Sequence, residues 1–89
     1  MKTCDWSINL EDEWFEQNPA KLFREAVEAA RNTAQGYFVN LVVPGSVREP
    51  EREFVSDLAR CLREENIPVQ DICYIDQCGC GGHVIRVYR

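Results

Sequence analysis

Thiol, imidazole and glycine residues are concentrated in one short segment near the C-terminus. The run Cys78–His83 reads Cys-Gly-Cys-Gly-Gly-His, and Cys73 lies just upstream of it. Together these residues include three of the five cysteines of the chain, three of its five glycines and its single histidine. Thiols and imidazole bind soft metals, thiols also exchange disulfides and react with radicals, and glycine allows tight backbone bends. This composition indicates a loop that takes part in chemistry, presented by the rest of the chain as a scaffold.

Metal binding is one chemistry that the segment could support. Cys73, Cys78, Cys80 and His83 would supply three thiolates and one imidazole, a set that suits tetrahedral Zn²⁺. Cys78 and Cys80 alone could hold Zn²⁺ or Cu(I) as a pair. The spacing C-x4-C-x-C-x2-H departs from the usual zinc-knuckle spacings. Cys73 could instead point into the core, where a buried cysteine behaves as a small hydrophobic residue.

Dithiol redox chemistry is a second interpretation of the same loop. Cys78 and Cys80 are separated by one residue, so a disulfide between them would close a small, strained ring. Strain makes a disulfide easier to reduce, and such a pair would therefore be oxidising. In the plainest interpretation, the glycines only form a turn and both cysteines are inert.

Composition and charge limit the class of protein. The 89 residues predict one domain, 1–89, with an ordinary hydrophobic share of 45%. No apolar run approaches the ~20 residues that span a bilayer, and residues 1–6 lack the apolar stretch of a secretory signal. We therefore expect a cytoplasmic protein that has reduced thiols and no membrane partner. The net charge of −5 argues against a nucleic-acid partner. The acidic residues, such as those of 11–13, are interpreted as a solvated surface.

Hydrophobic periodicity predicts the elements of the first half of the chain. Residues 6–10 alternate apolar and polar side chains, which is typical of a strand, and the acidic residues 11–17 are expected to form a loop. Asn18 and Pro19 predict the start of a helix, for which Gly36 would be the left-handed cap.

The second half is predicted to add one helix and three strands. The apolar run 37–43 indicates a central strand that is covered on both faces, or a strand of a parallel sheet. Pro50 predicts the start of the second helix. Residues 69–75 and 83–88 are predicted strands, joined by a glycine-rich hairpin loop at 76–82.

These elements predict an α/β fold with the order β-α-β-α-β-β. Two helices would pack on a mixed four-stranded sheet to form a two-layer sandwich. Strands separated by a helix are expected to pair in parallel. The last two strands would form an antiparallel C-terminal hairpin that carries the Cys-Gly-Cys-Gly-Gly loop. The exposed edges of such a small sheet would allow a homodimer.

The loop and its flanks resemble a known protein family. The stretch Asp76–Val84, followed by Arg86 and Val87, is similar to the signature of the CGCGG family of radical-SAM-modified peptides (RiPPs). Members of that family are small and are encoded beside radical-SAM enzymes. The similarity covers most of the chain and extends upstream to Trp6-Ser7, Asn9-Leu10, Val39–Val42 and Gly45.

The resemblance implies that the protein is a substrate and not an enzyme. A radical-SAM maturase, using an iron–sulfur cluster and S-adenosylmethionine, would modify Cys78, Gly79, Cys80, Gly81 and Gly82. The cysteines are the natural sulfur donors and the glycine α carbons the natural sites of attack, because flanking amides stabilise a glycyl radical. The protein itself would need no cofactor, and no Ser-His-Asp set, P-loop or acidic dyad indicates catalysis. Because the motif lies inside a hairpin, we expect the modified protein to stay whole.

Four individual residues carry expectations of their own. His83 is expected to face solvent from its strand, with a ligand role as the alternative. Trp14 and Phe15 would either fold back over a helix end or anchor a partner. Cys61 lies on the apolar stripe of the second predicted helix and is expected to be buried and inert.

Overall fold

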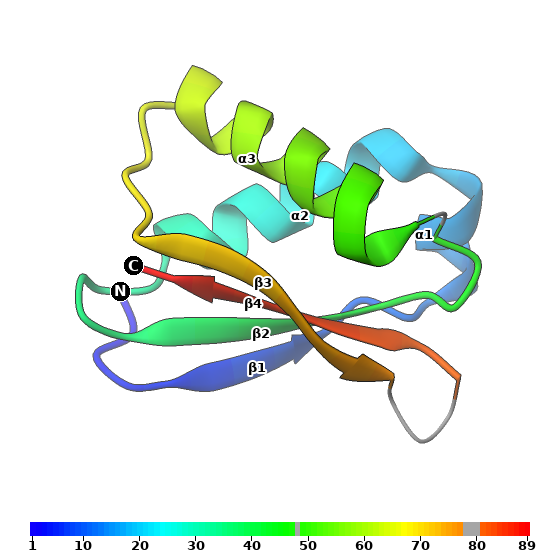
Figure 1. Cartoon of the computed structure of the whole chain (residues 1–89), viewed down its shortest axis with the longest axis horizontal. Coiled ribbons are helices and arrows are strands. Elements are labelled where there is room, and N and C mark those ends of the chain that lie inside the picture. The colour runs from blue at the N-terminus through cyan, green and yellow to red at the C-terminus, as the bar shows by residue number, and fades with distance from the viewer. Residues whose placement is uncertain (48, 78–80) are drawn as a thin grey trace.

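The helices and strands follow the predicted order along the chain (Figure 1). The computed structural model describes residues 1–47, 49–77 and 81–89. In chain order, the elements are β1 (Trp6–Asn9), α1 (Glu13–Gln17), α2 (Pro19–Arg31), β2 (Phe38–Val43), η1 (Pro50–Phe54), α3 (Val55–Glu64), β3 (Asp71–Gln77) and β4 (His83–Tyr88). The predicted α/β class, with a four-stranded sheet under two main helices, is confirmed.

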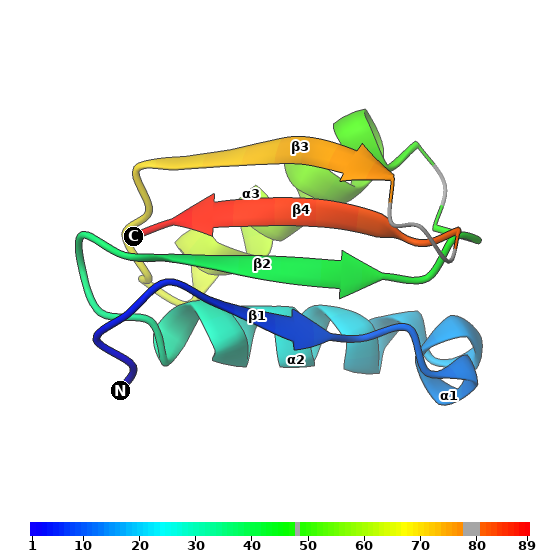
Figure 2. The ribbon, with the colours of Figure 1, turned by 90° about the horizontal axis from the view of Figure 1, so that it is seen from below.

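The sheet is mixed and has the strand order β1-β2-β4-β3 (Figure 2). β1 pairs with β2 in parallel, and β4 is antiparallel to both β2 and β3. Parallel pairing of helix-separated strands is therefore confirmed for β1 and β2 and wrong for β2 and β3, because β4 lies between them. β4 takes the central position because it supplies the fully buried Ile85 and Val87, whereas β3 exposes Asp71, Asp76 and Gln77 and suits an edge.

β2 is a central strand, but in the described residues the helices cover one of its faces. Val39, Leu41 and Val43 are fully buried, while the alternating Phe38 and Asn40 are only half-buried. Of the two alternatives given for this apolar run, cover on both faces is wrong, and the parallel partner is found in β1. The chain moves in the same direction across the sheet from β1 to β2 and from β2 to β3, and each of these connections contains a helix. Because such crossover connections share the same handedness, both place their helices on the same face of the sheet.

The acidic segment 11–17 contains a short helix where a loop was expected. Asp12 is the N-cap of α1, and its carboxylate accepts a hydrogen bond of 2.8 Å from the backbone N–H of Trp14. The Asn18 amide donates a hydrogen bond to the Trp14 carbonyl, also at 2.8 Å, and so joins the end of α1 to the start of α2.

α2 begins at Pro19 as predicted and ends at Arg31, before the expected cap at Gly36. The cause is Thr33, which is fully buried beyond the helix end. Its hydroxyl donates to the Ala29 carbonyl and accepts from the Trp6 indole N–H, both at 2.8 Å. Gly36 instead adopts φ 92° in the turn that leads to β2.

The second helix begins at Pro50, as predicted, with the π-helical turn η1 that runs into α3. Asn66, which follows the end of α3, adopts φ 58° and turns the chain back toward the sheet. β3 covers Asp71–Gln77, two residues later than the predicted 69–75, and β4 has the predicted bounds.

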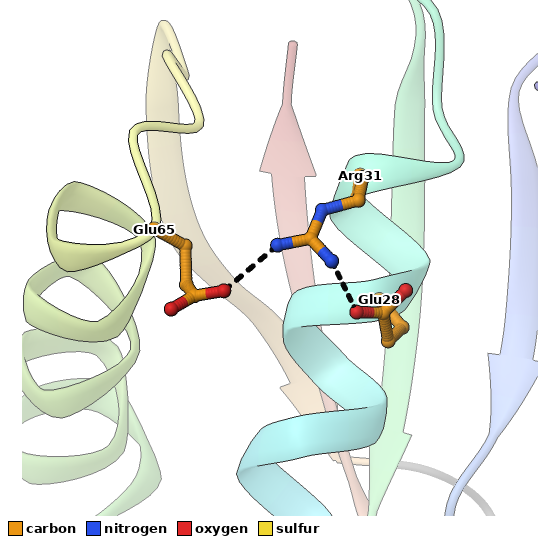
Figure 3. Close-up of polar contacts among 3 residues, drawn as sticks. All are labelled: Glu28, Arg31 and Glu65. Atoms are coloured by element: carbon orange, nitrogen blue, oxygen red, sulfur yellow. Dashed lines mark hydrogen bonds and ion pairs between the residues drawn. The ribbon is translucent and has the colours of Figure 1, made fainter.

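An ion-pair bridge connects the C-terminal ends of α2 and α3 (Figure 3). The Arg31 guanidinium contacts Glu28 on its own helix and Glu65 beyond α3, the latter at 2.8 Å. All three side chains are about half-exposed, so each pair contributes at most about 1 kcal/mol. Burial of the apolar side chains between the helices and the sheet is therefore the main stabilising term. Among the described residues, no helix has the length and apolar character needed to cross a membrane.

Candidate modification site at the end of the β3–β4 hairpin

The motif connects the C-terminal end of β3 to the start of β4. Cys78, Gly79 and Cys80 lie outside the described residues. The flanking strands are described and stay paired up to the loop, with Gln77 opposite His83. The C-terminal ends of β2 and β3 lie at the same end of the molecule as α1 (Figures 1 and 2).

A β-bulge precedes the loop on β3. The register shifts between Tyr74, which pairs with Ile85, and Asp76, which pairs with Val84. A bulge increases the local twist of a strand and re-aims the residues that follow it. The Asp76 carboxylate accepts a hydrogen bond of 2.7 Å from the Gln77 backbone N–H, which stabilises this irregular end of the strand.

The two described glycines of the motif have opposite environments. Gly81 is exposed and has φ 97°, and no heavy atom of the described residues lies within 4 Å of the position that a Cβ would occupy. Gly82 is buried, and its Cβ position meets the Glu11 carboxylate and lies 2.7 Å from the Val43 carbonyl oxygen. The α carbon of Gly81 is thus accessible from outside, and that of Gly82 is shielded.

Gly45 supports the same loop from the turn after β2. A Cβ on Gly45 would collide with the carbonyl oxygen of Gly81, so the two backbones can approach this closely only because Gly45 has no side chain. The position was singled out by the family resemblance alone, and the structure supplies a physical reason for glycine there.

Glu11 is the site residue that sequence reasoning missed. It was interpreted as part of a solvated acidic surface, but it is half-buried and its carboxylate lies against Gly82. Its backbone N–H donates to the Asn9 side chain at 2.8 Å, which fixes the direction in which the chain leaves β1. The sequence signal for this role is weak, because one carboxylate among several gives no indication of which will meet the loop.

His83 was expected to face solvent, but it lies on the helix-covered face of the sheet. It pairs with the buried Val43 across β2 and β4, so its side chain points to the helix-covered face. The imidazole is half-buried, with Nδ1 3.0 Å from the Tyr74 hydroxyl. This hydrogen bond orients the ring at the point where the loop enters β4.

Cys73 lies on the opposite, uncovered face of the sheet, so the suggestion that it points into the core is wrong. It pairs with Arg86, whose guanidinium stacks 4.0 Å from the centre of the Phe38 ring and donates to the Asn40 side chain. Cys73 and His83 therefore lie on opposite faces of the sheet. Within the described ranges, no group of three His, Cys, Asp or Glu side chains is placed to hold a metal.

The remaining two cysteines lie on other segments of the chain. Cys61 is half-buried on α3, less completely than expected, and Cys4 is exposed near the N-terminus. Both are free thiols, as is Cys73. None of the described cysteines is paired with another, so disulfides among them do not stabilise the fold.

A comparison with protein families finds a match over the whole printed chain. The matching model is described as "Putative radical SAM target protein" and covers residues 1–89. No curated protein and no solved structure matches the chain. The family match agrees with the resemblance of the Cys-Gly-Cys-Gly-Gly segment to radical-SAM-modified peptides. This chain therefore belongs to the family of putative radical SAM target proteins.

Proposed function

We propose that this protein is a folded substrate whose Cys-Gly-Cys-Gly-Gly segment is modified by a radical-SAM maturase. The observation that carries the proposal is the family match over residues 1–89, whose printed description is that of a target. The proposed sites are Cys78 and Cys80 as sulfur donors and the glycines of the motif as carbon sites. The chemistry belongs to the maturase, so the chain needs no catalytic residue or resident cofactor of its own.

The proposed product is a thioether between a cysteine sulfur and a glycine α carbon. S-adenosylmethionine is the oxidant: one electron from the maturase's iron–sulfur cluster cleaves it to methionine and a deoxyadenosyl radical, which removes one α hydrogen. As sulfur bonds to the resulting glycyl radical, the thiol proton leaves and one electron returns to the cluster. Each thioether thus removes two hydrogen atoms from the substrate and converts one S-adenosylmethionine to methionine and 5′-deoxyadenosine.

Gly81 is the better carbon site of the two described glycines. Its α carbon is exposed, and the surrounding space admits a substituent. Gly82 is shielded by the Glu11 carboxylate and the Val43 carbonyl, so a bond there would require the start of β4 to move. We therefore place the bridge on Gly81 in preference to Gly82.

The modified protein is proposed to remain whole. β4 follows the motif directly and hydrogen-bonds to β2 on one side and β3 on the other. It also supplies two fully buried core residues, Ile85 and Val87. Cleavage that released the loop would separate this central strand from the rest of the chain. The cytoplasm is the proposed location, because thiols stay reduced there until the maturase acts.

Intact mass of the protein from its native host tests the proposed function. The protein would be reduced and measured both denatured and native. We expect the denatured mass to be lower than that of the sequence by two hydrogen atoms per thioether, with fragmentation placing the change between Cys73 and His83. An unmodified denatured mass would overturn the proposal, and a metal ion on the native form would then favour the metal-binding alternative.

A further inference from the structure

An apolar pocket lies at the loop end of the molecule and has no part in the site described above. Its volume is about 240 Å³. Its aromatic lining comes from three elements: Phe15 of α1, Phe23 of α2 and Phe54 of η1. The Phe23 and Phe54 rings stack with centroids 5.0 Å apart, which makes one wall rigid. α1 and the start of α3 lie toward the same end of the molecule as the end of β3 and the start of β4 (Figure 1).

The rim of this pocket is acidic. Glu16, Glu53 and Asp57 all contribute to its lining, and Asp57 is partly balanced by Arg60 at 3.3 Å. Next to the rim, the pKa of Glu49 is raised because Glu53 hydrogen-bonds to it and adds negative charge nearby, followed by smaller effects of desolvation and of Glu51. Glu49 also lies 3.6 Å from the Arg52 guanidinium, so the raised pKa reports on its immediate neighbour Glu53, which lines the pocket.

An exposed tryptophan stands beside the pocket. Trp14 is 51% exposed and contacts Phe15 edge-on, with ring centroids 5.2 Å apart. Tryptophan is one of the residues that most often contribute a large share of the binding energy at protein interfaces. Of the two roles considered for Trp14 and Phe15, Phe15 folds back onto the core, while Trp14 is left on the surface.

We propose that the pocket, its acidic rim and Trp14 form the surface on which the radical-SAM maturase docks. The expected occupant is a segment of the enzyme that inserts an apolar or aromatic side chain flanked by lysine or arginine. The apolar lining would bury the inserted side chain, and the rim carboxylates would attract the flanking cations and speed association. Docking here would hold the strand ends that flank the motif at a fixed distance from the bound enzyme. This inference rests on the proposed function, because it names the surface that the same partner recognises.

Charge reversal tests the rim. Glu16→Lys with Glu53→Lys reverses two exposed carboxylates, and Glu25→Lys with Glu64→Lys makes the same change in net charge on exposed residues outside the pocket lining. With the host's radical-SAM enzyme, we expect the rim variant to raise KM for modification at least about tenfold with kcat unchanged, since the loop itself is intact. The control variant should stay within about twofold of the wild type.

Truncation of Trp14 tests the aromatic part of the proposed surface, and it leaves the core residues unchanged. Trp14→Ala should weaken binding of the enzyme about tenfold. Tyr37→Ala is the matched control, because Tyr37 is also exposed, at 36%, and precedes β2 at the opposite end of the sheet. Circular dichroism would verify that each variant has the wild-type fold, and the substitution at an exposed side chain makes loss of the fold an unexpected result.

The two proposals fail in different ways. If the wild-type chain is modified and the rim and Trp14 variants are modified with wild-type KM, the docking surface is overturned while the substrate role stands. If the enzyme leaves the wild-type chain unmodified, the proposed function is overturned and the docking surface with it. A loss of affinity that is confined to the rim and Trp14 variants and that decreases as salt is added supports the docking surface.

Discussion

The Glu11 carboxylate lies against the α carbon of Gly82, where the motif loop enters β4. A side chain on Gly82 would also meet the Val43 carbonyl oxygen, and a side chain on Gly45 would meet the Gly81 carbonyl oxygen. Contacts from two separate parts of the chain, the segment after β1 and the end of β2, therefore hold the exit of the loop in place. These contacts leave the α carbon side of Gly81 open to solvent.

Gly82→Ala should lower the free energy of unfolding by about 1–3 kcal/mol, because its methyl group would overlap a backbone carbonyl and a carboxylate. Urea unfolding measures the loss. A double-mutant cycle with Glu11→Ala separates the two contacts: part of the loss should be recovered when the carboxylate is absent. Strictly additive effects would show that Glu11 does not press on Gly82.

Gly81 and Gly82 should differ in whether they carry the thioether bridge. Fragmentation of the modified protein should locate the loss of hydrogen at Gly81 and not at Gly82. Gly81→Ala should reduce the modified fraction strongly, since its added methyl group hinders attack on the α carbon. A bridge located on Gly82 would contradict the shielding that Glu11 and Val43 provide.

The cysteines should differ in their importance for modification. Cys78→Ser together with Cys80→Ser should abolish the mass change while the protein keeps its fold, because the apolar core between the helices and the sheet is built from residues outside the motif. Cys73→Ser should leave modification unchanged, since Cys73 lies on the uncovered face beside Arg86. Loss of the fold on replacing Cys78 and Cys80 would point instead to a structural metal, which added Zn²⁺ should then restore in the wild type.

Thr33→Val should destabilise the protein by about 1–3 kcal/mol although valine has nearly the same shape, because the partly buried indole N–H of Trp6 and the buried Ala29 carbonyl would each lose a hydrogen-bond partner. Thermal unfolding followed by tryptophan fluorescence measures the effect. Thr33→Ser, which keeps the hydroxyl, is the control and should retain more of the stability. Equal losses in the two variants would mean that the methyl group of Thr33, and not its hydrogen bonds, matters.

The acidic group beside the pocket predicts a specific pH dependence. The pKa of Glu49 is raised in the folded state, first by its hydrogen bond to Glu53 and by the charge of that residue. A folded-state pKa above the unfolded value means that the folded protein binds the proton more tightly, so stability decreases as the pH rises through this range. NMR titration should find the pKa of Glu49 above the ordinary glutamate value. Glu53→Gln should lower it, Glu64→Gln should not, and a normal value in the wild type would contradict the arrangement.

Sequence patterns were sufficient for the motif and for every element type except the short helix α1. The alternation around Ile8, the helix start at Pro19 and the apolar run of β2 are local features, and local periodicity reports directly on secondary structure. The Cys-Gly-Cys-Gly-Gly segment was found from composition alone, and its family resemblance agrees with the match over the full length. The short helix α1 escaped prediction because it buries no residue and so has no apolar stripe, and hydrogen bonds at its two ends, from Trp14 to Asp12 and from Asn18 to Trp14, define it instead.

The tertiary structure alone decided how the site is built. The β-bulge between Tyr74 and Asp76 pairs Cys73 with Arg86 and so places Cys73 and His83 on opposite faces of the sheet, and the sequence carries no local signal for that register shift. The contacts of Glu11 and Gly45 with the loop connect residues more than thirty positions apart, so sequence spacing carries no trace of them. The chain's sequence determined which groups can react, and packing between distant segments determined which of them are accessible.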